Sequence, residues 1–97
     1  MKLDWSKRAT EDLFRIGDFI AKDSAENARL HVQLLMDRAV RAIQFPKSGR
    51  IVPEFQDENI REFIEGNYRI VFETSREAVT VLTVFEAHRL LKKSELR

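Results

Sequence analysis

The dipeptide Gly66-Asn67 separates two strand-like segments, residues 60–65 and 68–73. A two-residue connection of this composition accepts the positive backbone angles of a tight β-hairpin. A third segment, residues 79–85, is rich in the β-branched residues that suit a central strand. The second half of the chain therefore predicts a sheet built around one hairpin.

Pairing the hairpin across this turn assigns its residues to two faces of the sheet. The face that is heavier in aromatic residues is expected to contact helices. It comprises Arg61, near its edge, with Phe63, Tyr68, Ile70 and Phe72. The opposite face comprises Ile60, Glu62, Ile64, Arg69, Val71 and Glu73. We expect helices to leave this second face uncovered, so that function is to be sought there and at the end of the sheet.

Two amphipathic helices are predicted in the first half of the chain. Ser6 is the predicted N-cap of a helix over about residues 7–22, and Ser24 that of a second helix that extends almost to Pro46. Only two residues separate these helices, so we expect an antiparallel hairpin. Apolar residues recur at intervals of three and four in both helices. The positions expected to stabilise the core are Leu13, Ile16, Ile20, Val32, Met36 and Val40.

The order of the predicted elements indicates an α+β fold. Residues 2–5 alternate charged and apolar side chains and predict a short first strand. The order β-α-α-β-β-β then places an N-terminal strand and a two-helix hairpin on a curved, mostly antiparallel four-stranded sheet. Residues 46–59 contain turn formers and predict an ordered surface loop. At 97 residues, the chain is expected to be a single domain over residues 1–97.

The composition narrows the classes of function. The chain has no cysteine, which excludes disulfides and thiolate metal sites and fits a reducing cytoplasm. Its two histidines lack a zinc-site spacing and its glycines form no phosphate loop, so no metal or other cofactor is expected. The net charge of +1 disfavours a dedicated RNA-binding protein, since such proteins carry a clear basic excess. No apolar run suits a membrane span or a signal peptide, so a soluble, cytoplasmic protein is expected.

Cationic side chains accompany the predicted strands and could converge at one end of the sheet. They are Arg50, Arg61, Arg69, His88 and Arg89. Because an imidazole can gain or lose a proton near neutral pH, His88 could act as general acid or base in RNA cleavage, with arginines stabilising the charge on the phosphate. His88 could equally bond a backbone carbonyl at the end of a strand. Arg69 could likewise form no more than a surface ion pair with Glu62, diagonally across the hairpin, with a contribution well under about 1 kcal/mol.

Six motifs, in order and spacing, resemble the RelE/ParE superfamily of toxins from bacterial toxin–antitoxin pairs. They are Trp5-Ser6, Asp12-Leu13, Pro46 with Gly49-Arg50, Ile60-Arg61-Glu62, Tyr68-Arg69-Ile70-Val71-Phe72 and His88-Arg89, and they cover nearly the whole chain. The resemblance implies a toxin that is neutralised by a small antitoxin protein. The partly disordered tail of such an antitoxin folds along the toxin surface, commonly over the helical hairpin and the sheet edge.

One branch of this superfamily, the RelE-like toxins, cleaves mRNA in the ribosomal A site. Its members use basic residues on the second and third strands and a tyrosine or histidine near the C-terminus. In this chain Arg69 matches the third-strand arginine, whereas Arg61 and Phe63 replace the two second-strand lysines. The late tyrosine is missing, because the only tyrosine is Tyr68. In this reading the catalytic residues are Arg61, Arg69 and His88, and the activity is that of a metal-independent endoribonuclease.

The other branch, the ParE-like toxins, poisons DNA gyrase and shows no nuclease site. The segment from Gly49-Arg50 to Ile60-Arg61-Glu62, the ending His88-Arg89 and the near-neutral charge resemble this branch more closely. The resemblance therefore implies a toxin that inhibits gyrase by binding, with the ribonuclease as the alternative. A third reading is an inactive relative that only binds its antitoxin and helps to repress their operon.

The resemblance implies two protein partners, a cognate antitoxin and DNA gyrase; in the alternative, the ribosome and mRNA replace gyrase. It implies no contact with a membrane and allows a hetero-oligomer with the antitoxin. We expect the target-binding surface at the cationic end of the sheet and in the amphipathic tail, residues 90–97. Its predicted members are Arg50, Arg61, Arg69, His88, Arg89, Leu90 and Leu91.

Overall fold

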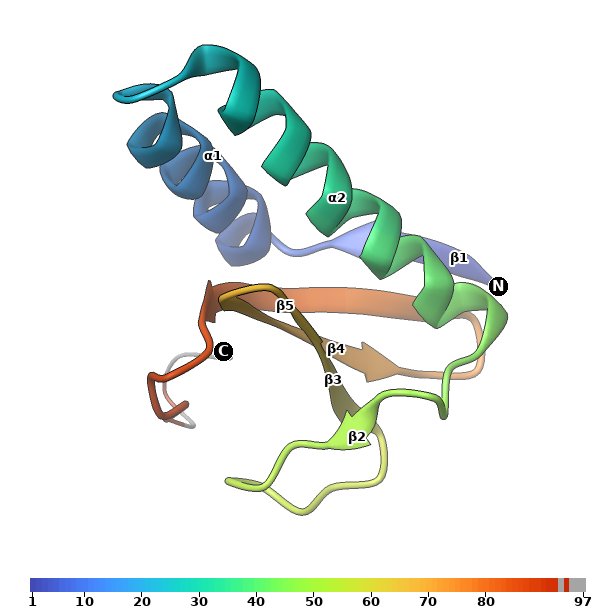
Figure 1. Cartoon of the computed structure of the whole chain (residues 1–97). Coiled ribbons are helices and arrows are strands. Elements are labelled where there is room, and N and C mark those ends of the chain that lie inside the picture. The colour runs from blue at the N-terminus through green and yellow to red at the C-terminus, as the bar shows by residue number, and fades with distance from the viewer. Residues whose placement is uncertain (93, 95–97) are drawn as a thin grey trace.

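The computed structural model describes residues 1–92 and 94. Within these residues the elements are β1 (Lys2–Trp5), α1 (Lys7–Ala21), α2 (Ala25–Gln44), β2 (Arg50–Ile51), β3 (Ile60–Glu65), β4 (Tyr68–Thr74) and β5 (Ala78–Glu86). The two helices run side by side on one side of the sheet (Figure 1). The predicted α+β class and the order of its principal elements are confirmed.

The strands form one sheet in the order β1-β5-β4-β3-β2. The pair β1 and β5 is parallel, and the other three neighbouring pairs are antiparallel. The sheet therefore has one strand more than predicted, because β2 lies within the expected surface loop. This strand has two residues, with Arg50 opposite Glu62 and Ile51 opposite Arg61. Such a short segment carries no alternation that the sequence could reveal.

The hairpin of β3 and β4 has the predicted register and turn. Glu65 pairs with Tyr68 across Gly66-Asn67, and Gly66 has a positive φ of 59°. The two predicted faces are also confirmed. Phe63, Ile70 and Phe72 pack in apolar clusters with helix residues, whereas Ile60 and Val71 belong to a separate cluster.

Both predicted N-caps are present. The Ser6 Oγ accepts a hydrogen bond from the backbone N–H of Ala9 at 3.0 Å, and the Ser24 Oγ accepts one from that of Asn27 at 3.1 Å. In α1 the predicted core position Ile16 is buried. Leu13 and Ile20 are partly buried and pack against the core.

The face that α2 buries differs from the predicted one. The buried residues of this helix are Ala28, Leu35, Ala39 and Ala42. The predicted core positions Met36 and Val40 are 41% and 45% exposed, and Val32 is only half-buried. Apolar residues cover more than one stripe of α2, and the stripe of alanines lets the helix backbone come close to the sheet. Met36 and Val40 therefore lie on the outer side of the helical hairpin.

Buried Asp12 connects α1 to β5. Its Oδ2 accepts hydrogen bonds from the Thr83 hydroxyl at 2.6 Å and from the Val84 N–H at 3.0 Å. Its Oδ1 pairs with Arg15 on the same helix and lies 3.7 Å from the Nε of Arg8. The Asp12 carboxylate of α1 thus accepts hydrogen bonds from polar groups of β5, the strand that this helix covers.

None of the described helices is long and apolar enough to span a membrane.

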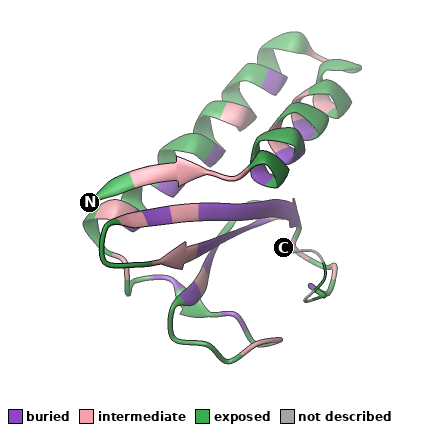
Figure 2. Cartoon of the chain, turned by 180° about the vertical axis from the view of Figure 1, so that it is seen from behind, coloured by how far each residue is buried: buried purple, intermediate pink, exposed green. Residues whose placement is uncertain are grey.

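The second face of the sheet is covered, contrary to the expectation that it is open. Val52 and Phe55, from the segment after β2, and Leu91, beyond β5, pack there. They contact the strand residues Ile60, Val71, Leu82 and Phe85. Figure 2 shows the buried residues concentrated in the strands, with exposed residues on the outer sides of the helices. The chain therefore buries apolar residues on both sides of its sheet.

Candidate functional site

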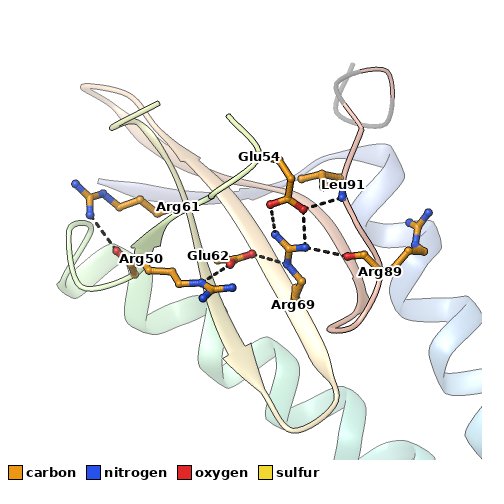
Figure 3. Close-up of polar contacts among 8 residues, drawn as sticks. Arg50, Glu54, Arg61, Glu62, Arg69, Arg89 and Leu91 are labelled. Atoms are coloured by element: carbon orange, nitrogen blue, oxygen red, sulfur yellow. Dashed lines mark hydrogen bonds and ion pairs between the residues drawn. The ribbon is translucent and has the colours of Figure 1, made fainter. Parts of the chain in front are cut away.

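Arg69 of β4 is the centre of the polar contacts on the second face of the sheet (Figure 3). The alternation of β4 directs Arg69 away from the helices, onto the face that also carries Glu62 of β3. The Arg69 Nε donates to the Glu62 Oε1 at 2.6 Å. Both residues are buried, with exposed fractions of 4% and 1%. The predicted ion pair between them is therefore confirmed, but its expected place at the surface is wrong, because the segment after β2 and the C-terminal segment cover it.

Glu54, in the segment after β2, binds the other end of the same guanidinium. Its Oε1 and Oε2 accept from the Arg69 Nη2 and Nη1, each at 2.8 Å, which is a bidentate pair. These hydrogen bonds from Arg69 lower the pKa of Glu54 from its usual 4.5 to about 2. In return, the hydrogen bonds to Glu54 raise the pKa of Arg69 above its usual value. Glu54 and Arg69 therefore both carry their charges at physiological pH.

The same pair holds the C-terminal segment. The Arg69 Nη1 also donates to the Arg89 carbonyl at 2.9 Å, and the Leu91 N–H donates to the Glu54 Oε2 at 2.8 Å. The Leu91 side chain is buried, with 4% exposed. Leu90, between these two anchored residues, is 75% exposed. The chain beyond β5 is thus tied to β4 and to the segment after β2.

Two further predicted site residues are also engaged. The Arg50 Nε pairs with the Glu62 Oε2, on the opposite side of this carboxylate from Arg69 (Figure 3). The guanidinium of Arg61 donates to the backbone carbonyls of Glu58 and Gly49, each at 3.0 Å. Arg61 thereby holds together the segments before and after the short strand β2, which is a structural role.

His88 and Arg89 lie just beyond β5, as predicted. His88 is exposed, and Arg89 is half-buried, with its guanidinium 4.9 Å from the ring centroid of Phe85. The guanidinium of Arg69 lies at the same distance from that ring. The Arg89 Nε is 4.0 Å from a carboxylate oxygen of Glu86. The end of the sheet therefore gathers cations, but each of the arginines has a partner within the fold.

The predicted tail, residues 90–97, is described only in part. Residues 93 and 95–97 lie outside the described residues, so its predicted amphipathic character stays a prediction. Among the described residues, no cluster of histidine, aspartate and glutamate side chains could hold a metal ion.

Sequence reasoning missed Glu54 and the burial of Glu62. Glu54 lies in a segment without periodicity, where nothing distinguishes it from Glu58 or Asp57. One signal was available: an arginine in the middle of a strand as apolar as Tyr68-Arg69-Ile70-Val71-Phe72 needs a carboxylate partner if it is buried. That signal predicts a partner for Arg69 but does not identify which glutamate provides it.

A separate apolar groove lies on the outer side of the helical hairpin. It has a volume of about 460 Å³ and is lined by Trp5, Thr10, Leu13, Phe14, Gly17, Asp18, Val32 and Met36. Phe14 is 70% exposed beside it. Gly17 allows the two helices to approach closely here, because a Cβ at this position would lie 3.2 Å from the Cγ2 of Val32. The groove is on the opposite side of the sheet from Arg69 and is distinct from its network.

Comparisons with known proteins identify one family and one solved structure with a similar fold. A family model described as the ParE toxin of type II toxin-antitoxin system, parDE, matches residues 3–91. Among solved structures, a chain of the chromosomal ParDE TA system from P. aeruginosa superposes with a TM-score of 0.74 at 21% sequence identity. The match covers 89% of this chain and 95% of that one. No curated protein sequence matches this chain.

Proposed function

Because the chain belongs to the ParE toxin family of type II toxin–antitoxin systems, we propose that it arrests growth by binding DNA gyrase and that a cognate antitoxin neutralises it. In this proposal the protein is a binding inhibitor and not an enzyme. It acts in the cytoplasm as a single domain of residues 1–97, without a cofactor.

The internal pairing of the arginines supports binding over the alternative, ribosome-dependent cleavage of mRNA. A nuclease stabilises its transition state with cations that are directed at the phosphate. Arg69 is instead buried between Glu54 and Glu62, and Arg61 is bonded to backbone carbonyls. For either guanidinium to reach a phosphate, it would have to break these bonds and leave buried carboxylates or carbonyls unpaired. His88 alone among the three candidate catalytic residues is exposed.

For the antitoxin we propose the apolar groove of the helical hairpin as the docking surface. Large apolar side chains that are exposed together on a small protein indicate an interaction site. Phe14 and Met36, which line the groove, are 70% and 41% exposed. An amphipathic segment of the antitoxin could place its apolar face in a groove of this kind.

For gyrase we propose the C-terminal segment and the adjacent end of the sheet. Of the seven predicted target-binding residues, Arg50, His88 and Leu90 are exposed. Arg69 and Leu91 are buried, so in this proposal they support the surface and do not touch the target. The two proposed partners thus use different sides of the molecule.

The proposal is tested by DNA supercoiling with purified gyrase, with and without this protein, and with cleavage of ribosome-bound mRNA measured in parallel. We expect supercoiling to stop while mRNA remains intact. Cleaved mRNA with normal supercoiling would overturn the gyrase target and favour the ribonuclease. Addition of the cognate antitoxin should restore supercoiling, and Met36→Glu in the hairpin groove should prevent this rescue without removing the inhibition.

A further inference from the structure

Leu90 is an exposed apolar side chain on a backbone that is fixed on both of its sides. Its own side chain is 75% exposed. The preceding carbonyl, of Arg89, accepts from Arg69, and the following N–H, of Leu91, donates to Glu54. The Leu91 side chain is inserted in the apolar cluster of the second face. An exposed leucine on a free chain end would sample many conformations, whereas this one has a restricted backbone.

The anchoring groups come from segments far apart in the sequence. Glu54 follows β2, Arg69 is in β4, and Leu91 lies beyond β5, 37 positions from Glu54. The guanidinium has little freedom of its own, because Glu62 binds its Nε and Glu54 binds both terminal nitrogens. The position of Leu90 therefore depends on residues from two distant segments in addition to the local chain.

We propose that Leu90 is the apolar anchor by which the protein binds its target, and that Glu54 and Arg69 are positioning residues that hold Leu90 in its binding conformation. This inference rests on the proposed function, in which the target is DNA gyrase. Binding surfaces derive most of their affinity from a few anchors that enter a pocket of the partner. An anchor whose backbone is already ordered loses less conformational entropy on binding. The target surface is then expected to offer an apolar pocket that accepts one leucine side chain.

The test is a double-mutant cycle of Leu90→Ala and Glu54→Ala, with inhibition of gyrase supercoiling and growth arrest in cells as readouts. Each single substitution should raise the concentration for half-inhibition by about tenfold. If Glu54 acts by holding Leu90, the double variant should also lose only about tenfold, because the anchor is already absent. A merely structural role of Glu54 would instead multiply the two losses to about a hundredfold. Multiplied losses, or a Leu90→Ala variant as potent as the wild type, would overturn the inference.

Two matched controls separate positioning from folding. Leu34→Ala removes another exposed leucine, on α2, and should retain wild-type potency. Glu62→Ala removes the other carboxylate of Arg69 but leaves the Glu54 bond to the Leu91 N–H in place. Hydrogen exchange at the Leu91 amide should therefore accelerate strongly in Glu54→Ala and less in Glu62→Ala, even if Glu62→Ala is the less stable variant. Equal acceleration in both would contradict the positioning role.

The outcomes distinguish this inference from the proposed function. If the wild type arrests growth but leaves gyrase active, the gyrase target is wrong, and the cycle is read from growth arrest alone. If the wild type inhibits gyrase and the losses of potency of the two single variants multiply in the double variant, the proposed function stands and the inference is wrong. A wild type that is inert in both assays overturns both.

Discussion

One face of the sheet is covered by two helices and an apolar core, whereas the other is covered by two short segments and a buried arginine between two glutamates. The helices pack through side chains such as Ile16 and Leu35, whose contribution is non-directional. The segments on the second face contribute few apolar residues, namely Val52, Phe55 and Leu91. Directed, charged hydrogen bonds accompany this small cluster and determine where the C-terminal segment lies.

The largest loss of stability is expected when the positive charge at the centre of the second face is removed. Arg69→Met would remove the cation paired with Glu54 and would leave the buried Glu62 with only the exposed Arg50. We expect a loss of about 3–5 kcal/mol in the free energy of unfolding, measured by urea denaturation. Arg50→Met removes the exposed partner of Glu62 and should cost no more than about 1 kcal/mol. Equal losses of unfolding free energy in the two variants would mean that the burial of Arg69 does not make its ion pairs more important for stability than that of Arg50.

On the helix face, the free energy of unfolding should depend more on the volume of buried apolar side chains than on charge. Leu35 is 2% exposed, whereas its neighbour Leu34 is 51% exposed. Leu35→Ala should lower the free energy of unfolding by about 2–5 kcal/mol, through lost burial and the cavity that remains. Leu34→Ala, the same chemical change on the same helix, should stay within about 0.5 kcal/mol in the same urea experiment. A large effect of Leu34→Ala would contradict the orientation of α2.

The helix face also contains a buried carboxylate, that of Asp12. Asp12→Asn keeps the shape but removes the charge that serves the Thr83 hydroxyl, the Val84 N–H and Arg15. We expect a loss of about 2–3 kcal/mol, measured by thermal and urea unfolding. Asp18→Asn, at an exposed position of α1, serves as the control and should have little effect. If both variants were neutral, the helix face would depend on its apolar core alone.

The second face should also be more sensitive to acid. The pKa of Glu54 is lowered to about 2 in the folded protein, so its contribution is complete above the unfolded value of about 4.5 and is lost as the pH falls toward 2. Between pH 5 and pH 3 the wild type should lose about 2 kcal/mol through this group. Glu54→Gln cannot titrate and should lack this part of the loss, as measured by urea unfolding at the two pH values. Identical pH profiles would show that Glu54 is not paired in solution.

The elements with a strong local signal were predicted closely from the sequence. Ser6 and Ser24 identified the starts of both helices, and Gly66-Asn67 determined the register of the hairpin. Alternation from that turn assigned the apolar residues of β3 and β4 that pack in the core, such as Phe63, Ile70 and Val71, to their correct faces. These features depend on residues that are neighbours in the chain, so a single sequence contains them.

The features that depend on distant segments were not predicted. The apolar residues of α2 form more than one stripe, and contact with α1 and the sheet decides that Leu35 is buried and Met36 is not. The Glu62–Arg69 pair was expected at the surface, because nothing in the sequence shows that Val52, Phe55 and Leu91 cover it. For the same reason Glu54, the residue that binds both Arg69 and the C-terminal segment, had no signal of its own.

The parallel pairing of β1 with β5 joins two strands that lie far apart in the sequence. Lys2 lies beside Ala78, and the Ser6 hydroxyl donates to the Leu82 carbonyl, 76 positions further along the chain. A growing chain that ends before Ala78 lacks the strand on which both β1 and α1 depend, so we expect it to remain sensitive to proteases. The domain should therefore fold only after β5 has been synthesised, because the pairing of β1 and the docking of α1 both require that strand.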